Sequence, residues 1–118
     1  MPGIMTVIKA DGGLVKTALD KAPGLEALQT AVGGYIEAVP YFDTYLGHPA
    51  VAYCNEEGKL KNLPYNEQAT RFWAYALHAT PGDLDDMLVG DIVVLTGDEW
   101  KKFRVSARVL IAWNARRL

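Results

Sequence analysis

The segment of residues 51–66 constrains the fold more than any other part of the chain, because most of its residues have a specific backbone preference. Residues 51–54 are apolar and partly β-branched, which suits a buried strand. A polar turn follows, and Gly58 is free to take a positive φ there. Residues 59–60 can pair back onto the first strand, so the pattern predicts a β-hairpin.

A helix is predicted directly after this segment. Pro64 fixes the direction of the chain, and Asn66 is well placed to cap the helix with its side-chain oxygen. Helical spacing puts five apolar residues on one predicted buried face: Ala69, Phe72, Trp73, Ala76 and Leu77. The helix is expected to end at residues 80–82, Thr-Pro-Gly.

The other elements follow from shorter patterns. A helix is predicted from the spacing of Leu25, Leu28 and Val32, with Pro23 in its first turn and its end at residues 33–34. Further strands are predicted at residues 4–9, 14–19, 35–39 and 91–96. Together these elements predict one α+β domain over residues 1–118. It would have a small, mainly antiparallel sheet of four or five strands with two or three packed helices.

Composition limits the cellular setting. The chain has 118 residues, enough for one domain with a core, and half of them are hydrophobic. Its one cysteine allows no internal disulfide, which fits a reducing cytoplasm. No apolar run approaches the roughly 20 residues of a membrane span, and the first residues do not resemble a signal peptide. A cytoplasmic protein without a membrane partner is therefore expected.

Charge divides the chain into two unequal parts. Residues 1–98 contain 6 Lys and Arg against 13 Asp and Glu, a net charge of −7. Residues 99–118 contain 6 Lys and Arg and one Glu, a net charge of +5. The basic segment fits both a helical and a strand-like apolar pattern, and its length and a capping box at its start favour a helix.

This basic C-terminal segment is a candidate interaction surface. Its cations suit the phosphates of a nucleic acid, whereas the acidic remainder of the chain would repel one. Trp100 and Trp113 lie on an apolar stripe, which favours packing or a homo-oligomer through the segment. The candidate residues for a partner or nucleic acid are Lys101, Lys102, Arg104 and Arg108.

Several short motifs carry a family resemblance. They are Leu-Glu-Ala-Leu-Gln at 25–29, Val-Gly-Gly-Tyr-Ile-Glu at 32–37, Asn-Glu-Glu-Gly-Lys-Leu at 55–60, Leu-Pro-Tyr-Asn-Glu-Gln-Ala at 63–69 and Leu-Val-Gly-Asp-Ile-Val-Val at 88–94. Their order and spacing over residues 24–97 resemble a family of small proteins, carried mostly by bacteriophages and plasmids, whose domain has no known function. The resemblance implies the cytoplasm of an infected or plasmid-bearing cell. It implies no reaction, cofactor or catalytic residue.

Catalytic chemistry is the weaker interpretation of the residues. Cys54 could form a thiol–imidazole pair with His48 or His78, but a single cysteine late in an apolar strand is more often a core residue. The acids Asp83, Asp85, Asp86 and Asp91 lack the spacing of a calcium loop and fit a helix start and a solvated turn. No catalytic residue, metal or cofactor is therefore predicted. A small hydrolase that uses Cys54 or the acidic cluster is a third hypothesis.

The helix start after Pro64 is the best candidate for ligand binding, because free N–H groups at a helix N-terminus suit anions. The candidate residues are Tyr65, Asn66, Gln68 and Arg71. The leading hypothesis is a non-enzymatic binding protein of a phage or plasmid. It would inhibit host defence by binding a host protein or by sequestering a small signalling nucleotide. The alternative is a nucleic-acid-binding accessory or regulatory protein that uses the basic C-terminal segment.

Overall fold

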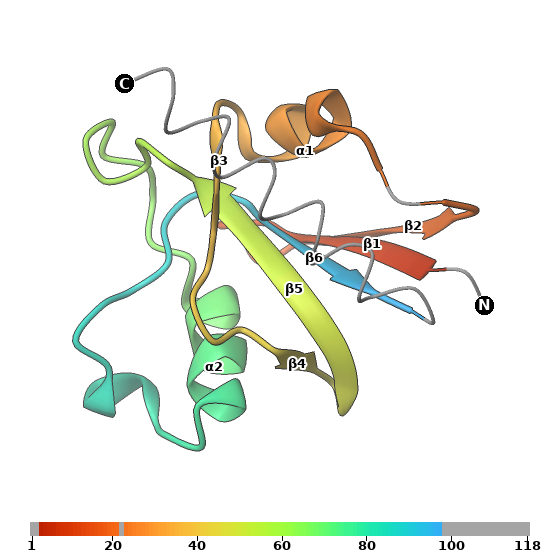
Figure 1. Ribbon diagram of the computed structural model, residues 1–118. Helices are drawn as coiled ribbons and strands as arrows, with labels where there is room; N and C mark the ends of the chain where they lie inside the picture. The colour runs from red at the N-terminus through yellow and green to blue at the C-terminus, as the bar shows by residue number, and fades with distance from the viewer. Residues whose placement is uncertain (1–2, 22, 98–118) are drawn as a thin grey trace.

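The computed structural model describes residues 3–21 and 23–97. Within them the chain forms six strands, two α-helices and one short 3₁₀ helix (Figure 1). The elements in order are β1 (Gly3–Ile8), β2 (Leu14–Leu19), α1 (Leu25–Val32), β3 (Ile36–Ala38), β4 (Thr44–Tyr45), β5 (His48–Asn55), α2 (Glu67–Ala76), η1 (Pro81–Asp83) and β6 (Ile92–Thr96). The predicted α+β class is confirmed, with one strand more than the upper count expected.

The sheet is antiparallel at every pairing. Its strand order is β2-β1-β6-β5-β3, and the short β4 pairs with β5 as a hairpin. The last strand of the described chain, β6, thus lies in the middle of the sheet between β1 and β5. All five of its residues are buried, as expected for a central strand with continuous β-branched and apolar residues.

Each face of the sheet has its own helix and its own core (Figure 1). Side chains alternate between the faces along a strand, so neighbouring residues of β5 enter different cores. Ala50 and Ala52 face α2 with Trp73, whereas Val51 and Tyr53 face α1 with its buried Leu28 and Val32. The two helices therefore cover the β5–β6 half of the sheet from opposite sides.

The helix α1 agrees closely with its prediction. It begins at Leu25 after the N-cap Gly24, so Pro23 precedes the helix and does not lie in its first turn. It ends at Gly33, which has the left-handed conformation with φ 78° and donates its N–H to the carbonyl of Gln29.

The helix α2 begins as predicted, but its buried face is different. Asn66 caps it by accepting the N–H of Ala69 at 3.0 Å. The fully buried residues are Ala69, Thr70, Trp73 and Ala74, whereas Phe72, Ala76 and Leu77 are only partly buried. The prediction was right in part: Ala69 and Trp73 are buried, and Phe72 and Leu77 still pack against the core. It missed Thr70, whose hydroxyl is buried with hydrogen-bond partners of its own.

The predicted hairpin after Cys54 was also wrong. Residues 56–62 form consecutive turns, in which the N–H of Lys61 reaches the carbonyl of Glu57 and that of Leu63 reaches Gly58. Gly58 does not have a positive φ. Glycine is needed there for close approach, since a Cβ atom would lie 2.9 Å from a methyl group of Val89.

Two further predictions concern the C-terminal segment and the membrane. The predicted helix or strand at residues 99–118 lies outside the described residues. None of the helices in the described part of the chain has the length and apolar character needed to cross a lipid bilayer.

Candidate functional site

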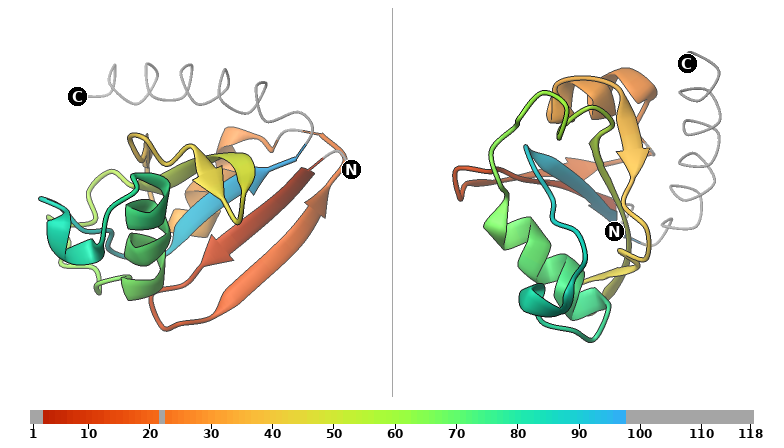
Figure 2. Two further views of the ribbon diagram at one scale, coloured as in Figure 1. Left: turned by 90° about the horizontal axis from the view of Figure 1, so that it is seen from below. Right: turned by 90° about the vertical axis from the view of Figure 1, so that its left-hand side faces the viewer.

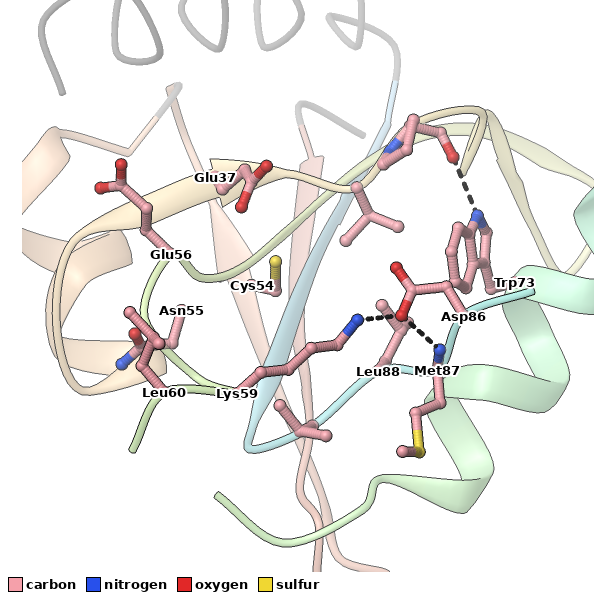
Figure 3. Close-up of a pocket in the computed structure, with 13 residues that line it drawn as sticks. Glu37, Cys54, Asn55, Glu56, Lys59, Leu60, Trp73, Asp86, Met87 and Leu88 are labelled. Atoms are coloured by element: carbon pink, nitrogen blue, oxygen red, sulfur yellow. Dashed lines mark hydrogen bonds and ion pairs between the residues drawn. The ribbon is translucent and has the colours of Figure 1, made fainter. Parts of the chain in front are cut away.

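A cavity of about 160 Å³ lies beside the β3 edge of the sheet (Figure 3). Its walls come from β3 and the loop after it, the end of β5, the turns that follow, α2, and the loop before β6. The lining residues are Glu37, Val39, Pro40, Cys54, Asn55, Glu56, Lys59, Leu60, Trp73, Asp86, Met87, Leu88 and Val89.

The apolar part of this cavity belongs to the core on the α2 face. Val39, Trp73 and Leu88 are buried members of that core, and Cys54 packs against it. The Trp73 indole N–H donates to the carbonyl of Pro40 at 2.8 Å, which fixes the loop after β3 over the helix (Figure 3). The apolar wall is therefore held in place by the fold itself.

The polar part of the cavity is charged. Lys59 and Asp86 form an ion pair across it, and the same Asp86 oxygen accepts the N–H of Met87 at 2.8 Å (Figure 3). Both side chains of the pair are more than half exposed, at 56% and 53%, so the pair contributes at most about 1 kcal/mol. Glu37 and Glu56 add two further carboxylates near Cys54.

The Cys54 thiol is not activated. Burial, together with the neighbouring Glu37 carboxylate, raises its pKa to about 12. His48 lies at the other end of β5, six residues away, which is about 20 Å along a strand. His78 is exposed beyond the end of α2. Cys54 is thus a protonated thiol and lacks the lowered pKa of a nucleophile.

The acidic cluster has structural partners. Asp83 accepts both the N–H and the hydroxyl of Thr80, which lowers the pKa of its carboxyl group. Asp91 accepts the N–H of Ala10, and Asp86 pairs with Lys59. In the part of the chain that the structure describes, no group of three or more His, Cys, Asp and Glu is arranged to hold a metal ion.

The four predicted ligand residues do not form one site. Asn66 is 1% exposed, and its side-chain amide donates to the carbonyls of Ile8 and Gly90, both at 2.8 Å. Its side-chain oxygen accepts the N–H of Ala69, so the Asn66 side chain has no accessible group left to bind a ligand. Tyr65 forms a β-bridge with Val89 and lies over a different groove from Gln68 and Arg71.

Gln68 and Arg71 line an open groove between α2 and the β4–β5 turn. Its walls are mostly apolar, with Leu46, Phe72 and Tyr75. Arg71 is already paired with Glu67, one helical turn before it, at 2.7 Å. A single, partly neutralised cation is a weak basis for phosphate binding, so this groove does not support the nucleotide hypothesis.

The predicted partner or nucleic-acid residues Lys101, Lys102, Arg104 and Arg108 all lie outside the described residues. Conversely, sequence reasoning missed Glu37, Lys59 and Asp86 as site residues. They come from three separate segments, and no local pattern connects them. The nearest signal in the sequence was Trp73, which was predicted on the buried face of its helix and lines the same cavity.

Comparison with known proteins assigns the sequence to a family. The sequence of residues 5–110 matches a family described as Domain of unknown function (DUF3846). The chain belongs to this family. The DUF3846 match is longer at both ends than the motif pattern over 24–97, since it includes β1, β2 and the first part of the basic segment. No curated protein and no solved structure matches the chain.

Proposed function

We propose that this DUF3846 protein is a non-enzymatic binding protein, and that its cavity receives a basic side chain of a protein partner. One observation carries the proposal. The cavity combines a fixed apolar wall, which includes Trp73, with the carboxylates of Glu37, Glu56 and Asp86. An indole and carboxylates together suit a guanidinium or ammonium group.

The size of the cavity supports a side chain as the ligand. At about 160 Å³ it is smaller than the roughly 300–1,000 Å³ of typical small-molecule sites. Its charge disfavours a signalling nucleotide, because carboxylates repel phosphates and residues 1–98 carry a net charge of −7.

The rim of the cavity resembles a protein-binding surface. Leu60 is 84% exposed and Met87 is 49% exposed, and both line the cavity. Exposed apolar side chains, and adaptable methionines in particular, are common on surfaces that bind protein partners. The partner would thus contribute an apolar contact area in addition to its cation.

Lys59 is an internal competitor in this proposal. The Lys59 ammonium group pairs with the Asp86 carboxylate, so without a partner the site already contains a cation from this chain. A partner cation would displace Lys59 or bind between Glu37 and Glu56. Removing the Lys59 charge should therefore strengthen the binding of an external cation.

The biological setting is part of the proposal. The phage and plasmid setting that the motif resemblance implies suggests that the partner is a host defence protein in the cytoplasm, which the chain would inhibit by occupying it. Nucleic-acid binding through residues 99–118 is the competing function, and its supporting observation is the net charge of +5 in that segment. It predicts binding that weakens steeply with salt and is lost when residues 99–118 are deleted.

The test uses N-acetyl-arginine methylamide as the probe and its citrulline analogue as a neutral isostere. We expect a saturable shift of the Trp73 indole N–H signal in NMR with the arginine probe, at a Kd of about 1 mM, and no shift with citrulline. Replacing both Glu37 and Glu56 by Gln should weaken binding at least about fivefold.

Lys59→Gln provides a sharper prediction, because it should tighten arginine binding by about two- to fivefold. Lys61→Gln is the matched control: it makes the same charge change, but Lys61 pairs with Glu57 and lies outside the cavity. Equal shifts with arginine and citrulline, or equal effects of the two lysine variants, would refute the proposal. Saturable binding of a nucleotide that is released unchanged would favour the sequestration hypothesis instead.

A further inference from the structure

The outer strand β2 is unusually open. It forms one edge of the sheet, and within the described residues it pairs only with β1 (Figure 2). Five of its six residues are exposed, and Leu14 and Val15 are 43% and 46% exposed. Leu19, at the end of the strand, packs against the core on the α1 face, whereas the five residues before it are exposed.

This edge lacks most of the features that usually protect an edge strand. Its register with β1 runs through six consecutive residue pairs without a bulge. The strand contains no proline, and Lys16 is its only charged residue. The opposite edge, β3, has only three residues. Proteins commonly protect edges with bulges, prolines, several charges or short strands, so an edge like β2 is suited to pairing with another strand.

We infer that β2 pairs antiparallel with β2 of a second copy of this chain, forming a two-fold dimer with a continuous sheet. The strand itself supports a second copy as the partner. A two-fold axis perpendicular to the sheet places residues of the same face opposite each other, so only a few registers are available. In one of these, Lys16 faces Lys16 of the second copy, which is unfavourable.

The register with Thr17 on the axis avoids this repulsion. It places Val15 opposite Leu19 of the second copy and Lys16 opposite Ala18. Val15 and Leu19 share a face with Met5 and Val7, as the β1–β2 register shows. These apolar side chains would then form one strip across the two-fold axis. Burying partly exposed Val and Leu is the main source of stability for such a dimer.

The hydrogen-bond pattern of the β1–β2 hairpin sets the backbone geometry at the axis. The N–H of Lys9 donates to the carbonyl of Gly13 at 2.8 Å. Because successive residues point to opposite sides, Thr17 also points its backbone groups to β1, whereas Lys16 and Ala18 point theirs outward. The Thr17–Thr17 pair is therefore non-hydrogen-bonded, with a Cα separation of about 4.5 Å, within the range of a disulfide.

The test is disulfide cross-linking in the full chain, with Cys54→Ala as the background. We expect Thr17→Cys to form a covalent dimer under mild oxidation at micromolar concentrations. Lys16→Cys is the matched control. It should cross-link at least about tenfold more slowly, because it faces Ala18 of the second copy. Faster cross-linking of Lys16→Cys, or a monomer in native mass spectrometry of the unmodified chain at about 100 μM, would overturn the proposal.

A second variant tests the β2 interface without a cross-link, in case the cysteine substitutions perturb folding. Lys16→Pro removes an outward backbone donor but leaves the β1 ladder intact, and proline is tolerated at such edge positions. It should give a monomer with unchanged circular dichroism and unchanged binding of the arginine probe. A dimer that persists in Lys16→Pro would refute the β2 interface. The basic C-terminal segment, which the sequence suggested for self-association, would then be the better candidate.

Discussion

Asn66 is the residue whose replacement should reveal most about how this fold is held together. Its side chain is almost completely buried and makes three hydrogen bonds: one caps α2, and two reach the carbonyls of Ile8 and Gly90. It thereby ties the start of α2 to β1 and to the loop before β6. These are segments that lie 58 and 24 residues away in the sequence.

The cost of Asn66→Ala can be worked out from these bonds. Losing a helix N-cap costs about 1 kcal/mol. Each buried carbonyl that loses its donor costs about 1–2 kcal/mol, at the lower end of the usual range because a carbonyl has a second lone pair. The sum is about 3–5 kcal/mol. At a urea slope of about 1.5 kcal/mol/M, the unfolding midpoint should fall by about 2–3 M.

Asn66→Ser separates the two contributions. Serine caps helices about as well as asparagine but cannot reach both carbonyls, so it should cost about 1 kcal/mol less than alanine. Gln68→Ala, on the same helix and partly exposed, is the control and should stay within about 0.5 kcal/mol of the unmodified chain. Urea unfolding followed by circular dichroism measures all three variants. A midpoint shift of less than about 0.5 M for Asn66→Ala, or a larger cost for serine than for alanine, would refute this reasoning.

Two further predictions concern glycine and cysteine. In urea unfolding, Gly90→Ala should destabilise the chain by about 1 kcal/mol more than Gly33→Ala. Both glycines have positive φ, but only at Gly90 would a Cβ atom lie close to another side chain, 2.8 Å from Leu63. Equal costs of the two substitutions would contradict the steric argument. For Cys54, burial raises the pKa from 9.0 to about 12, so its contribution to stability is complete below pH 9 and is lost as the pH rises towards 12. Cys54→Ala should flatten the fall of unfolding free energy over that range. The native thiol should react with Ellman's reagent at pH 8 far more slowly than the thiol of the urea-unfolded chain, and equal rates would contradict the raised pKa.

Local patterns predicted the elements well, because each signal acts over a few residues. The left-handed Gly33 and the Asn66 cap both mark helix ends through contacts within one turn. The face of α2 could not be predicted in the same way. Thr70 is polar in sequence, but its hydroxyl donates to the carbonyl of Asn66 and accepts the N–H of Leu88, so it is buried without an unsatisfied group.

The candidate site was harder to predict, because it depends on distant segments. Gly58 looked like a turn residue with positive φ, but the actual constraint is the side chain of Val89, which the sequence places far away. Lys59 and Asp86 are 27 residues apart and pair only because the loop before β6 returns to the end of β5. Neither contact has a signature in a single sequence.

The cavity and the β2 edge lie at opposite ends of the sheet. The strand order runs from β2 through β1, β6 and β5 to β3, and the cavity borders β3 and the end of β5. A dimer through β2 would therefore leave both cavities exposed at the two far ends of a continuous sheet. Such a dimer would present two cation-binding sites to a partner that is itself oligomeric. Linked sites of this kind raise overall affinity far above that of either site alone when the partner can occupy both. A cavity that binds a single side chain weakly would then suffice for tight binding of the whole partner.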